Sequence, residues 1–342
     1  MESIGKRIAK VTELPEVLSI SPPITEKTHM SFDISDFCNQ KCIYCTGRYM
    51  GVHKQGCHVD SDLFYRVTQE AFDLGVRELG LSLAGDPFTN PKFYDYVSYL
   101  KKIGFRYVFF STNGLLCNSK NLGKLASAGI DSIKFTISAV TEESYIAHHG
   151  TPGFEKVYEN LKYAYIYRKT HNYNYRLYVF SVITKQNMAH TAQMRKLFEP
   201  YCDELILFGM FNQFNMLTGC DIIYDDKGYG DITFVKQTLP CPEVFNRIAI
   251  NAKGQLSICC GASAGPVSVG AIVADLNKVS LRDAYYSEPF KLMREKHIKG
   301  NIQNTICNRC VKGIIEPMYS LHGELFEIKQ IDISQEIINA FN

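Results

Sequence analysis

The chain has 342 residues, of which 46% are hydrophobic and 21% charged, and its formal net charge is +2. These values exclude a mainly disordered chain and predict a globular protein of one large or two unequal domains. The balance of 37 basic and 35 acidic side chains leaves no basic excess that would favour a nucleic acid or an anionic membrane as partner.

The lack of a targeting segment and the number of cysteines together bear on the cellular compartment. The opening residues carry charges throughout, with no apolar signal-peptide core, and no later stretch is apolar for long enough to cross a bilayer. We therefore expect a cytoplasmic protein. That compartment keeps thiols reduced, so the twelve cysteines predict metal ligation in preference to a disulfide framework.

From about residue 28 the sequence alternates β-rich runs with helical patterns. Three segments pass from a helix end through a glycine into a strand, which suits the left-handed position that follows many helices. These glycines are Gly75, Gly104 and Gly129. Apolar residues at helical spacing predict helices over 91–103, 154–169 and 190–198, and six β/α units in all. Such alternation predicts a parallel sheet, open or rolled into a barrel, with its chemistry in the loops after the strands.

The β/α rhythm stops after residue 210. We expect an N-terminal extension over 1–27, the β/α core over 28–210, a linker over 211–240, a second cysteine region over 241–311 and a tail over 312–342. Within the second region, RIAINAKGQLSI is typical of a hairpin, with Gly254 at the turn position that needs positive φ.

A loop with three cysteines, CNQKCIYC, follows the first predicted strand. Its C-x3-C-x2-C spacing brings Cys38, Cys42 and Cys45 within reach of one metal centre, and soft thiolates favour zinc or an iron–sulfur cluster. Structural zinc normally takes a fourth ligand, and the nearby candidates are His53, Cys57 and His58. The alternative is a four-iron cluster whose fourth iron has no protein ligand and can bind a small molecule.

The cysteine loop and four later motifs together resemble the radical S-adenosylmethionine (SAM) superfamily. Aromatic Tyr44 precedes the third cysteine, and the other matches fall in order at successive strand ends. They are LAGDP (83–87), STNG (111–114), FTIS (135–138) and VITKQN (182–187). LAGDP departs from the family's Gly-Gly-Glu pattern at Ala84 and Asp86.

This resemblance implies a partial (β/α)6 TIM-like barrel in which Cys38, Cys42 and Cys45 hold a [4Fe-4S] cluster that binds SAM. One-electron cleavage of SAM then yields a 5′-deoxyadenosyl radical, which abstracts a hydrogen atom. The motif residues implied to contact the cofactor are Tyr44, Gly85, Asp86, Pro87, Ser111, Asn113, Ser138 and Thr184.

The second cysteine region resembles the SPASM auxiliary-cluster domain or its shortened twitch form. Gly254 and Cys259 make G-x4-C, and a C-x2-C pair follows at 307–310. The resemblance implies that a second [4Fe-4S] cluster, with no open iron, is held by Cys241, Cys259, Cys307 and Cys310. Zinc is the alternative for four cysteines at this spacing.

The remaining cysteines have no assigned ligand role: they are Cys57, Cys117, Cys202, Cys220 and Cys260. We expect Cys117 and Cys202 to be buried as small hydrophobes. Strand geometry separates the CC pair: successive side chains point to opposite faces, so we expect that Cys259 and Cys260 do not serve one metal together. In radical epimerases a thiol donates a hydrogen atom to the substrate radical, and Cys260 is the candidate donor here. The His148–Gly150 stretch after the fourth strand is expected to be a solvated loop.

The expected function is hydrogen abstraction from a polar small molecule, a sugar or an aminocyclitol, leading to oxidation or epimerisation. Flavodoxin or ferredoxin is the expected electron donor. About thirty residues precede the first strand, which disfavours a peptide-recognition domain there. Modification of a peptide or protein side chain is the first alternative, and a non-catalytic zinc or iron–sulfur protein is the second.

Overall fold

The computed structural model describes residues 14–49, 56–210, 239–263, 270–308 and 310. Residues 211–238 of the predicted linker, residue 311 and the whole predicted tail, 312–342, fall outside these ranges. Among the described residues, no helix combines the length and the apolar character that a bilayer span requires.

A single curved sheet contains all the strands that the described ranges form. The strands are β1 (His29–Phe32), β2 (Glu78–Gly80), β3 (Tyr107–Thr112), β4 (Ser132–Thr136), β5 (Arg176–Ile183), β6 (Glu204–Gly209), β7 (Arg247–Ile250), β8 (Gln255–Ser257) and β9 (Ile272–Asp275). Their order is β6-β5-β4-β3-β2-β1-β7-β8-β9, and neighbours from β6 through β7 are parallel. The predicted β/α core is thereby confirmed as a mixed α/β fold of the partial TIM-like kind.

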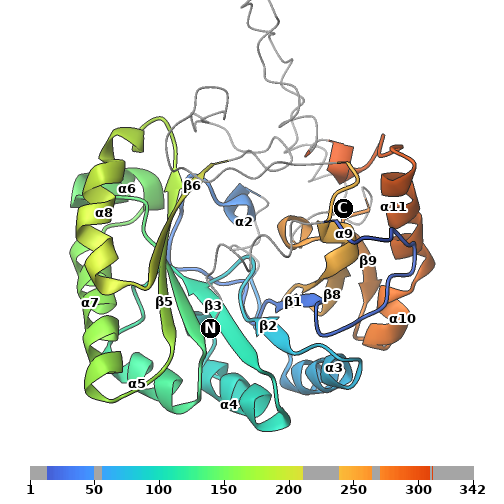
Figure 1. The fold of residues 1–342 in the computed structure, drawn as a ribbon, viewed down its shortest axis with the longest axis horizontal. Helices are drawn as coiled ribbons and strands as arrows, with labels where there is room; N and C mark the ends of the chain where they lie inside the picture. The colour runs from blue at the N-terminus through green and yellow to red at the C-terminus, as the bar shows by residue number, and fades with distance from the viewer. Residues whose placement is uncertain (1–13, 50–55, 211–238, 264–269, 309, 311–342) are drawn as a thin grey trace, which may run out of the picture.

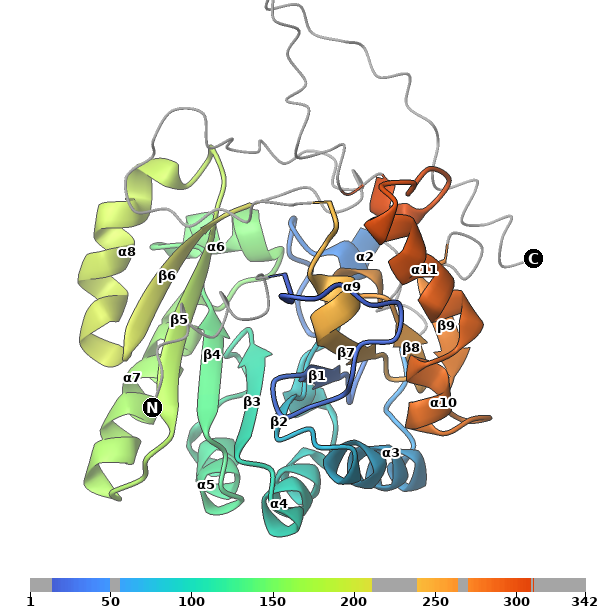
Figure 2. The ribbon, with the colours of Figure 1, turned by 45° about the vertical axis from the view of Figure 1, so that its right-hand side comes forward.

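Helices lie along the outer side of the curved sheet, whereas the short helix α2 lies inside its curve (Figure 1; Figure 2). The helices are α2 (Thr46–Tyr49), α3 (Ser61–Asp73), α4 (Phe93–Ile103), α5 (Ser119–Ser127), α6 (Glu142–His149), α7 (Phe154–Thr170), α8 (Thr191–Phe198), α9 (Glu243–Asn246), α10 (Leu281–Tyr285) and α11 (Glu288–Ile298). Gly75, Gly104 and Gly129 have φ of +107°, +108° and +88°, which confirms the predicted helix stops.

The sheet buries one face against the helices and turns the other toward the inside of its curve. In β4, Ile133 and Phe135 are fully buried in the hydrophobic core, so Lys134 between them points to the concave side. The register places Lys134 beside Ser111 of β3 and Tyr178 of β5.

The predicted hairpin is confirmed, because β7 and β8 pair antiparallel around a turn whose Gly254 has φ of +79°. The place of this hairpin within the sheet was not predicted. β7 also pairs in parallel with β1, from His29 opposite Arg247 to Phe32 opposite Ile250. The second cysteine region is therefore attached directly to the edge of the β/α sheet.

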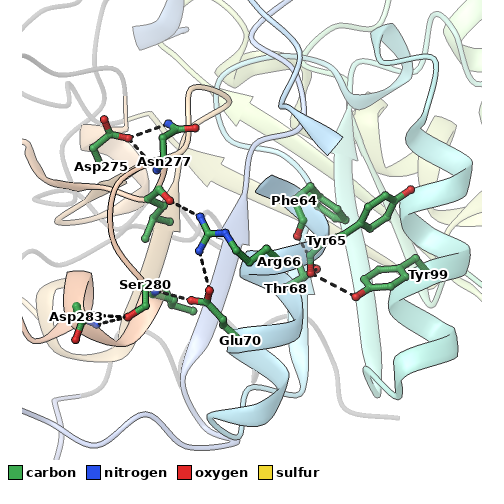
Figure 3. Close-up of polar contacts among 12 residues, drawn as sticks. Phe64, Tyr65, Arg66, Thr68, Glu70, Tyr99, Asp275, Asn277, Ser280 and Asp283 are labelled. Atoms are coloured by element: carbon green, nitrogen blue, oxygen red, sulfur yellow. Dashed lines mark hydrogen bonds and ion pairs between the residues drawn. The ribbon is translucent and has the colours of Figure 1, made fainter. Parts of the chain in front are cut away.

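Helix α3 holds the segment between β9 and α10 (Figure 3). The Glu70 carboxylate accepts the backbone N–H of Leu281, the first residue of α10, at 2.6 Å and pairs with Arg66 at 2.7 Å. Arg66 also donates to the carbonyl oxygen of Leu276. The Glu70 contact gives a partner to an N–H at the start of α10, and the Arg66 contact gives one to a carbonyl in the segment before it.

Candidate functional site

The three cysteines of the first loop lie beyond the end of β1 and are electrostatic neighbours. Burial, then Asp86, and then Cys45 raise the pKa of Cys38 to about 12. Burial, followed by the charges of Cys45 and Cys38, raises the pKa of Cys42 well above its usual value. Three half-buried soft donors that repel one another as thiolates fit an iron–sulfur core, whose positive charge would favour their ionised form.

The end of α6 holds this cysteine loop in place. The backbone N–H groups of Lys41 and Ile43 donate to the carbonyl oxygens of His149 and His148, each at 3.0 Å. A Cβ on Gly150 would lie 2.6 Å from the carbonyl oxygen of Lys41, so glycine permits the close approach. The expectation of a solvated loop here was wrong: His148 is 3% exposed and His149 is fully buried.

The His149 ring connects the fourth strand end to the cysteine loop. Its Nε2 accepts the backbone N–H of Ser138 at 3.1 Å, and its Nδ1 lies 3.1 Å from Oε1 of Gln40 and 3.5 Å from Sγ of Cys42. Burial, and then His148, lower the pKa of His149 to about 3, so the ring is neutral. Because Nε2 accepts, Nδ1 carries the proton and points it toward Gln40 and Cys42.

The LAGDP turn packs directly beneath the chain that leads into Cys38. A Cβ on Gly85 would lie 2.0 Å from the carbonyl oxygen of Ser35 and 2.6 Å from that of Phe37. Only glycine allows this contact. The N–H of Asp86 then donates to the carbonyl oxygen of Phe37 at 2.8 Å, which ties the turn to the loop.

The Asp86 carboxylate accepts hydrogen bonds from groups of the protein itself. It accepts the Thr112 hydroxyl at 2.8 Å, the N–H of Asn113 at 2.9 Å and the N–H of Phe88 at 3.1 Å, and the residue is 2% exposed. Burial raises its pKa, and these hydrogen bonds offset part of that rise. Contact between this carboxylate and SAM stays a prediction, and the geometry favours a role in shaping the turn.

Asp33 is a site residue that sequence reasoning missed. It follows β1, is fully buried, and accepts the N–H groups of Leu83 at 3.2 Å and Ala84 at 2.7 Å. Burial raises its pKa to about 7, against the opposing effect of the Ala84 hydrogen bond. The sequence feature that could have identified Asp33 is its position just past the end of a predicted strand.

The other predicted cofactor contacts gather along the same edge of the sheet, many of them in internal hydrogen bonds. Tyr44 OH lies 3.1 Å from Oγ of Ser138, which also accepts the N–H of Val182 at 3.0 Å. Asn113 donates from its amide to Oδ1 of Asn39 at 2.7 Å. Ser138 and Thr184 are fully buried, whereas Tyr44, Gly85 and Ser111 are half-buried. Pro87 is buried at the start of a short 3-10 helix.

The four cysteines of the second set also come together. Burial, then Glu243, then Cys307 and Cys310 raise the pKa of Cys241. The thiol of Cys259 has Cys260, Glu243, Cys307 and Cys241 as its charged neighbours. In the described part of the chain, no three His, Cys, Asp or Glu side chains converge as closely as one metal ion would require. Four gathered thiols are the ligand set that either a four-iron cluster or a structural zinc ion takes.

The reasoning that separated Cys259 from Cys260 was wrong in its geometry. β8 ends at Ser257, and Cys260 begins a 3-10 helix, Cys260–Ala262, for which Cys259 is the extended N-cap. The two thiols nevertheless have different surroundings. The Cys260 thiol donates to Oε2 of Glu243 at 3.5 Å, and Cys260 is an electrostatic neighbour of Lys134 on the concave side of β4.

The cysteines without a predicted ligand role lie in different parts of the structure. Cys117 is fully buried, as expected, whereas Cys202 is only half-buried. Cys57 donates its thiol to Asp36 at 3.7 Å, and His58 lies 3.1 Å from Oγ of Ser35, so both proposed fourth zinc ligands have other partners. His53 and Cys220 lie outside the described residues.

Comparison with known proteins identifies the β/α core. The Radical SAM superfamily matches residues 32–195. A probable GTP 3',8-cyclase of Saccharolobus islandicus is 28% identical over 137 residues, 38% of this chain and 41% of that protein. The tungsten-containing aldehyde ferredoxin oxidoreductase cofactor-modifying protein of Pyrococcus furiosus is 25% identical over 206 residues, 58% of this chain and 55% of that protein. The matches thus span about half the length of these relatives.

Solved structures share the fold over more of the chain. Streptococcus suis SuiB bound to its precursor peptide SuiA has a TM-score of 0.64 at 13% identity, covering 85% of this chain and 69% of that one. BtrN in complex with AdoMet and 2-DOIA has a TM-score of 0.52 at 14% identity, covering 83% and 91%. At these identities the likeness establishes the architecture.

Proposed function

The chain carries a domain of the Radical SAM superfamily in residues 32–195, and from this premise we propose that it abstracts a hydrogen atom from a polar small molecule. The substrate class we propose is a sugar or a cyclitol, and the outcome is oxidation or epimerisation at a carbon. Flavodoxin or ferredoxin is the proposed source of electrons.

One observation supports this function above the rest: the two cysteine sets are built differently. Cys38, Cys42 and Cys45 form a set of three beside the strand ends, while the second region gathers four. Three thiolates would leave one iron of a [4Fe-4S] cluster free for SAM, and four would close an auxiliary cluster. When bound, the first cluster and SAM would supply the radical that starts the reaction.

The chain's own share is to hold the loop that carries the three cysteines. His149 and Gly150 fix it on one side, and Gly85 with Asp86 fix it on the other, as the backbone hydrogen bonds show. These supports come from the ends of strands and helices, which keep a site more precisely placed than a free loop would.

The protonation state of the Cys260 thiol bears on whether the reaction is an epimerisation or an oxidation. Its thiol is enclosed, and burial, followed by the charge of Glu243, raises its pKa to about 11, so it stays an S–H group at neutral pH. In epimerisation this S–H bond breaks and a C–H bond forms on the substrate radical; the sulfur radical then takes one electron from the reduced flavodoxin or ferredoxin and one proton. In oxidation the substrate radical would instead pass one electron to an auxiliary cluster held by the second cysteine set, and release one proton to solvent, to give a carbonyl.

Solvent deuterium distinguishes these outcomes. The reconstituted protein, SAM, a reductant and candidate sugars are incubated without oxygen in heavy water, and the products are analysed by mass spectrometry. Deuterium on the product carbon, lost in Cys260→Ala but kept in Cys117→Ala, supports epimerisation. A carbonyl product without deuterium supports oxidation. Formation of 5′-deoxyadenosine only with an added peptide would overturn the small-molecule proposal.

A further inference from the structure

Lys134 places a positive charge on the concave side of the sheet. It occupies the middle of β4, where its fully buried neighbours Ile133 and Phe135 face the helices. Its ammonium nitrogen lies 4.6 Å from the ring centroid of Phe180 on β5, which is also on the concave side. A cation over an aromatic face is stabilised, but such a contact does not neutralise its charge.

The ammonium group has no counter-ion in the described part of the chain. It makes no hydrogen bond or ion pair there, and the titratable groups that influence its pKa are Cys260 and Arg247, neither of them a carboxylate. Burial is the main cause that lowers the pKa of Lys134 to about 8. The residue keeps some solvent-accessible surface although its ammonium is enclosed. A desolvated cation without a counter-ion costs free energy unless a ligand pairs with it from its accessible side.

The neighbouring cation is already neutralised. Arg247 contacts the Glu243 carboxylate through Nε at 2.6 Å and through Nη2 at 3.2 Å, and its Nη1 donates to Oγ of Ser31 at 3.2 Å. The Glu243 carboxylate therefore balances the charge of Arg247, and Lys134 is left with the unbalanced positive charge.

The end of β4 leads to the cysteine loop. Lys134 and Thr136 share one side of β4, which ends at Thr136, and two residues later Ser138 contacts Tyr44 of that loop. Four residues of extended chain span at most ~13 Å at ~3.3 Å each, so Lys134 lies within about that distance of Ser138.

We propose that Lys134 binds an oxyanion of the substrate, a phosphate or a carboxylate, and so holds the substrate carbon toward the cysteine loop. This inference rests on the proposed function, because it names the class of molecule that the same site accepts. Within that class it selects sugar phosphates and sugar acids, and it rejects cationic aminocyclitols, which would meet a like charge.

The test measures anion binding by the reconstituted full chain with isothermal titration under nitrogen. The probes are inorganic phosphate, acetate, neutral inositol and a diaminocyclitol. The variants are Lys134→Met, which keeps the length of the side chain, Lys134→Arg, which keeps the charge, and Lys120→Met on the exposed outer helix α5 as control. All samples are matched for iron content, their thermal midpoints are measured to verify folding, and 5′-deoxyadenosine is measured in each.

We expect the wild type to bind phosphate or acetate and Lys134→Met to bind it at least about tenfold more weakly. Lys134→Arg restores most of the binding, and Lys120→Met matches the wild type. Phosphate alone identifies a phosphorylated substrate, and acetate alone a sugar acid. Equal binding by wild type and Lys134→Met, or no anion binding by the wild type, overturns the inference. If no sample forms 5′-deoxyadenosine, the proposed function fails while the binding result still stands.

Discussion

Nδ1 of His149 lies 3.5 Å from Sγ of Cys42, while Nε2 of the same ring accepts the backbone N–H of Ser138 at 3.1 Å. One buried ring therefore joins the fourth strand end to the middle cysteine of the first set. No cysteine motif would reveal this link, because 107 residues separate the two side chains.

His149→Phe is expected to weaken the first metal site selectively. The substitution keeps the aromatic packing against Tyr145 but leaves the Ser138 N–H buried without an acceptor, at a cost of about 1–3 kcal/mol. Anaerobic reconstitution followed by iron analysis should show less iron than in the wild type. His171→Phe, at the exposed end of α7, is the control. Unchanged iron in His149→Phe would contradict a supporting role for the ring.

Gly85→Ala is expected to displace the chain that leads into Cys38. Its new Cβ would meet the carbonyl oxygens of Ser35 and Phe37 at 2.0 and 2.6 Å, so the backbone must move. We expect a lower thermal midpoint and poor iron incorporation. Gly123→Ala is the matched control, because its nearest contact is the Tyr167 hydroxyl at 3.4 Å and alanine favours the helix by ~1 kcal/mol. Equal behaviour of the two variants would refute the close-approach explanation.

Glu70→Ala tests how the second cysteine region is attached. The change removes the acceptor for the Leu281 N–H and the partner of Arg66, and should lower the free energy of unfolding by about 1–2 kcal/mol. Glu295→Ala removes a carboxylate paired with Lys299 on the surface of α11 and should cost less than about 0.5 kcal/mol. Chemical denaturation of the reduced protein measures both. A loss no greater for Glu70→Ala would show that α3 does not anchor α10.

The pKa of Lys134 makes a separate prediction about stability and pH. Folding lowers this pKa from 10.5 to about 8, so the folded chain holds the proton less tightly than the unfolded chain. The stability that this group contributes is therefore complete above about 10.5 and is lost as the pH falls toward 8. Lys134→Met should raise the free energy of unfolding at pH 7 by roughly 1–3 kcal/mol, with a smaller gain at pH 9.5. Denaturation at both values checks this, and a gain that does not shrink would contradict it.

Local patterns predicted the framework of this protein well. Glycines after helices and alternating apolar runs gave the β/α order, because each signal depends on a few adjacent residues. The pairing of β7 with β1 was not predictable, since it joins strands more than 200 residues apart. The burial of His148 and His149 was missed for the same reason: their partners are the backbone of the cysteine loop.

The candidate site likewise combines features that adjacent residues predict with features that depend on tertiary contacts. The cysteine spacing predicted which thiols gather, whereas the residues that support them, such as Asp33 and His149, depend on tertiary contacts. Lys134 was hidden because one lysine in an apolar strand does not reveal what surrounds it. The Cys259–Cys260 geometry was mispredicted because the strand ends two residues before the pair.

The most direct test of the radical SAM assignment compares the wild type with a variant in which Cys38, Cys42 and Cys45 are all changed to alanine. After anaerobic reconstitution, iron, zinc and 5′-deoxyadenosine are measured under a strong reductant with SAM. The wild type should hold about eight irons, four in each cluster, and form 5′-deoxyadenosine. The triple variant should keep about four irons and form none. A zinc-loaded wild type without 5′-deoxyadenosine, or a triple variant that still cleaves SAM, would contradict the account.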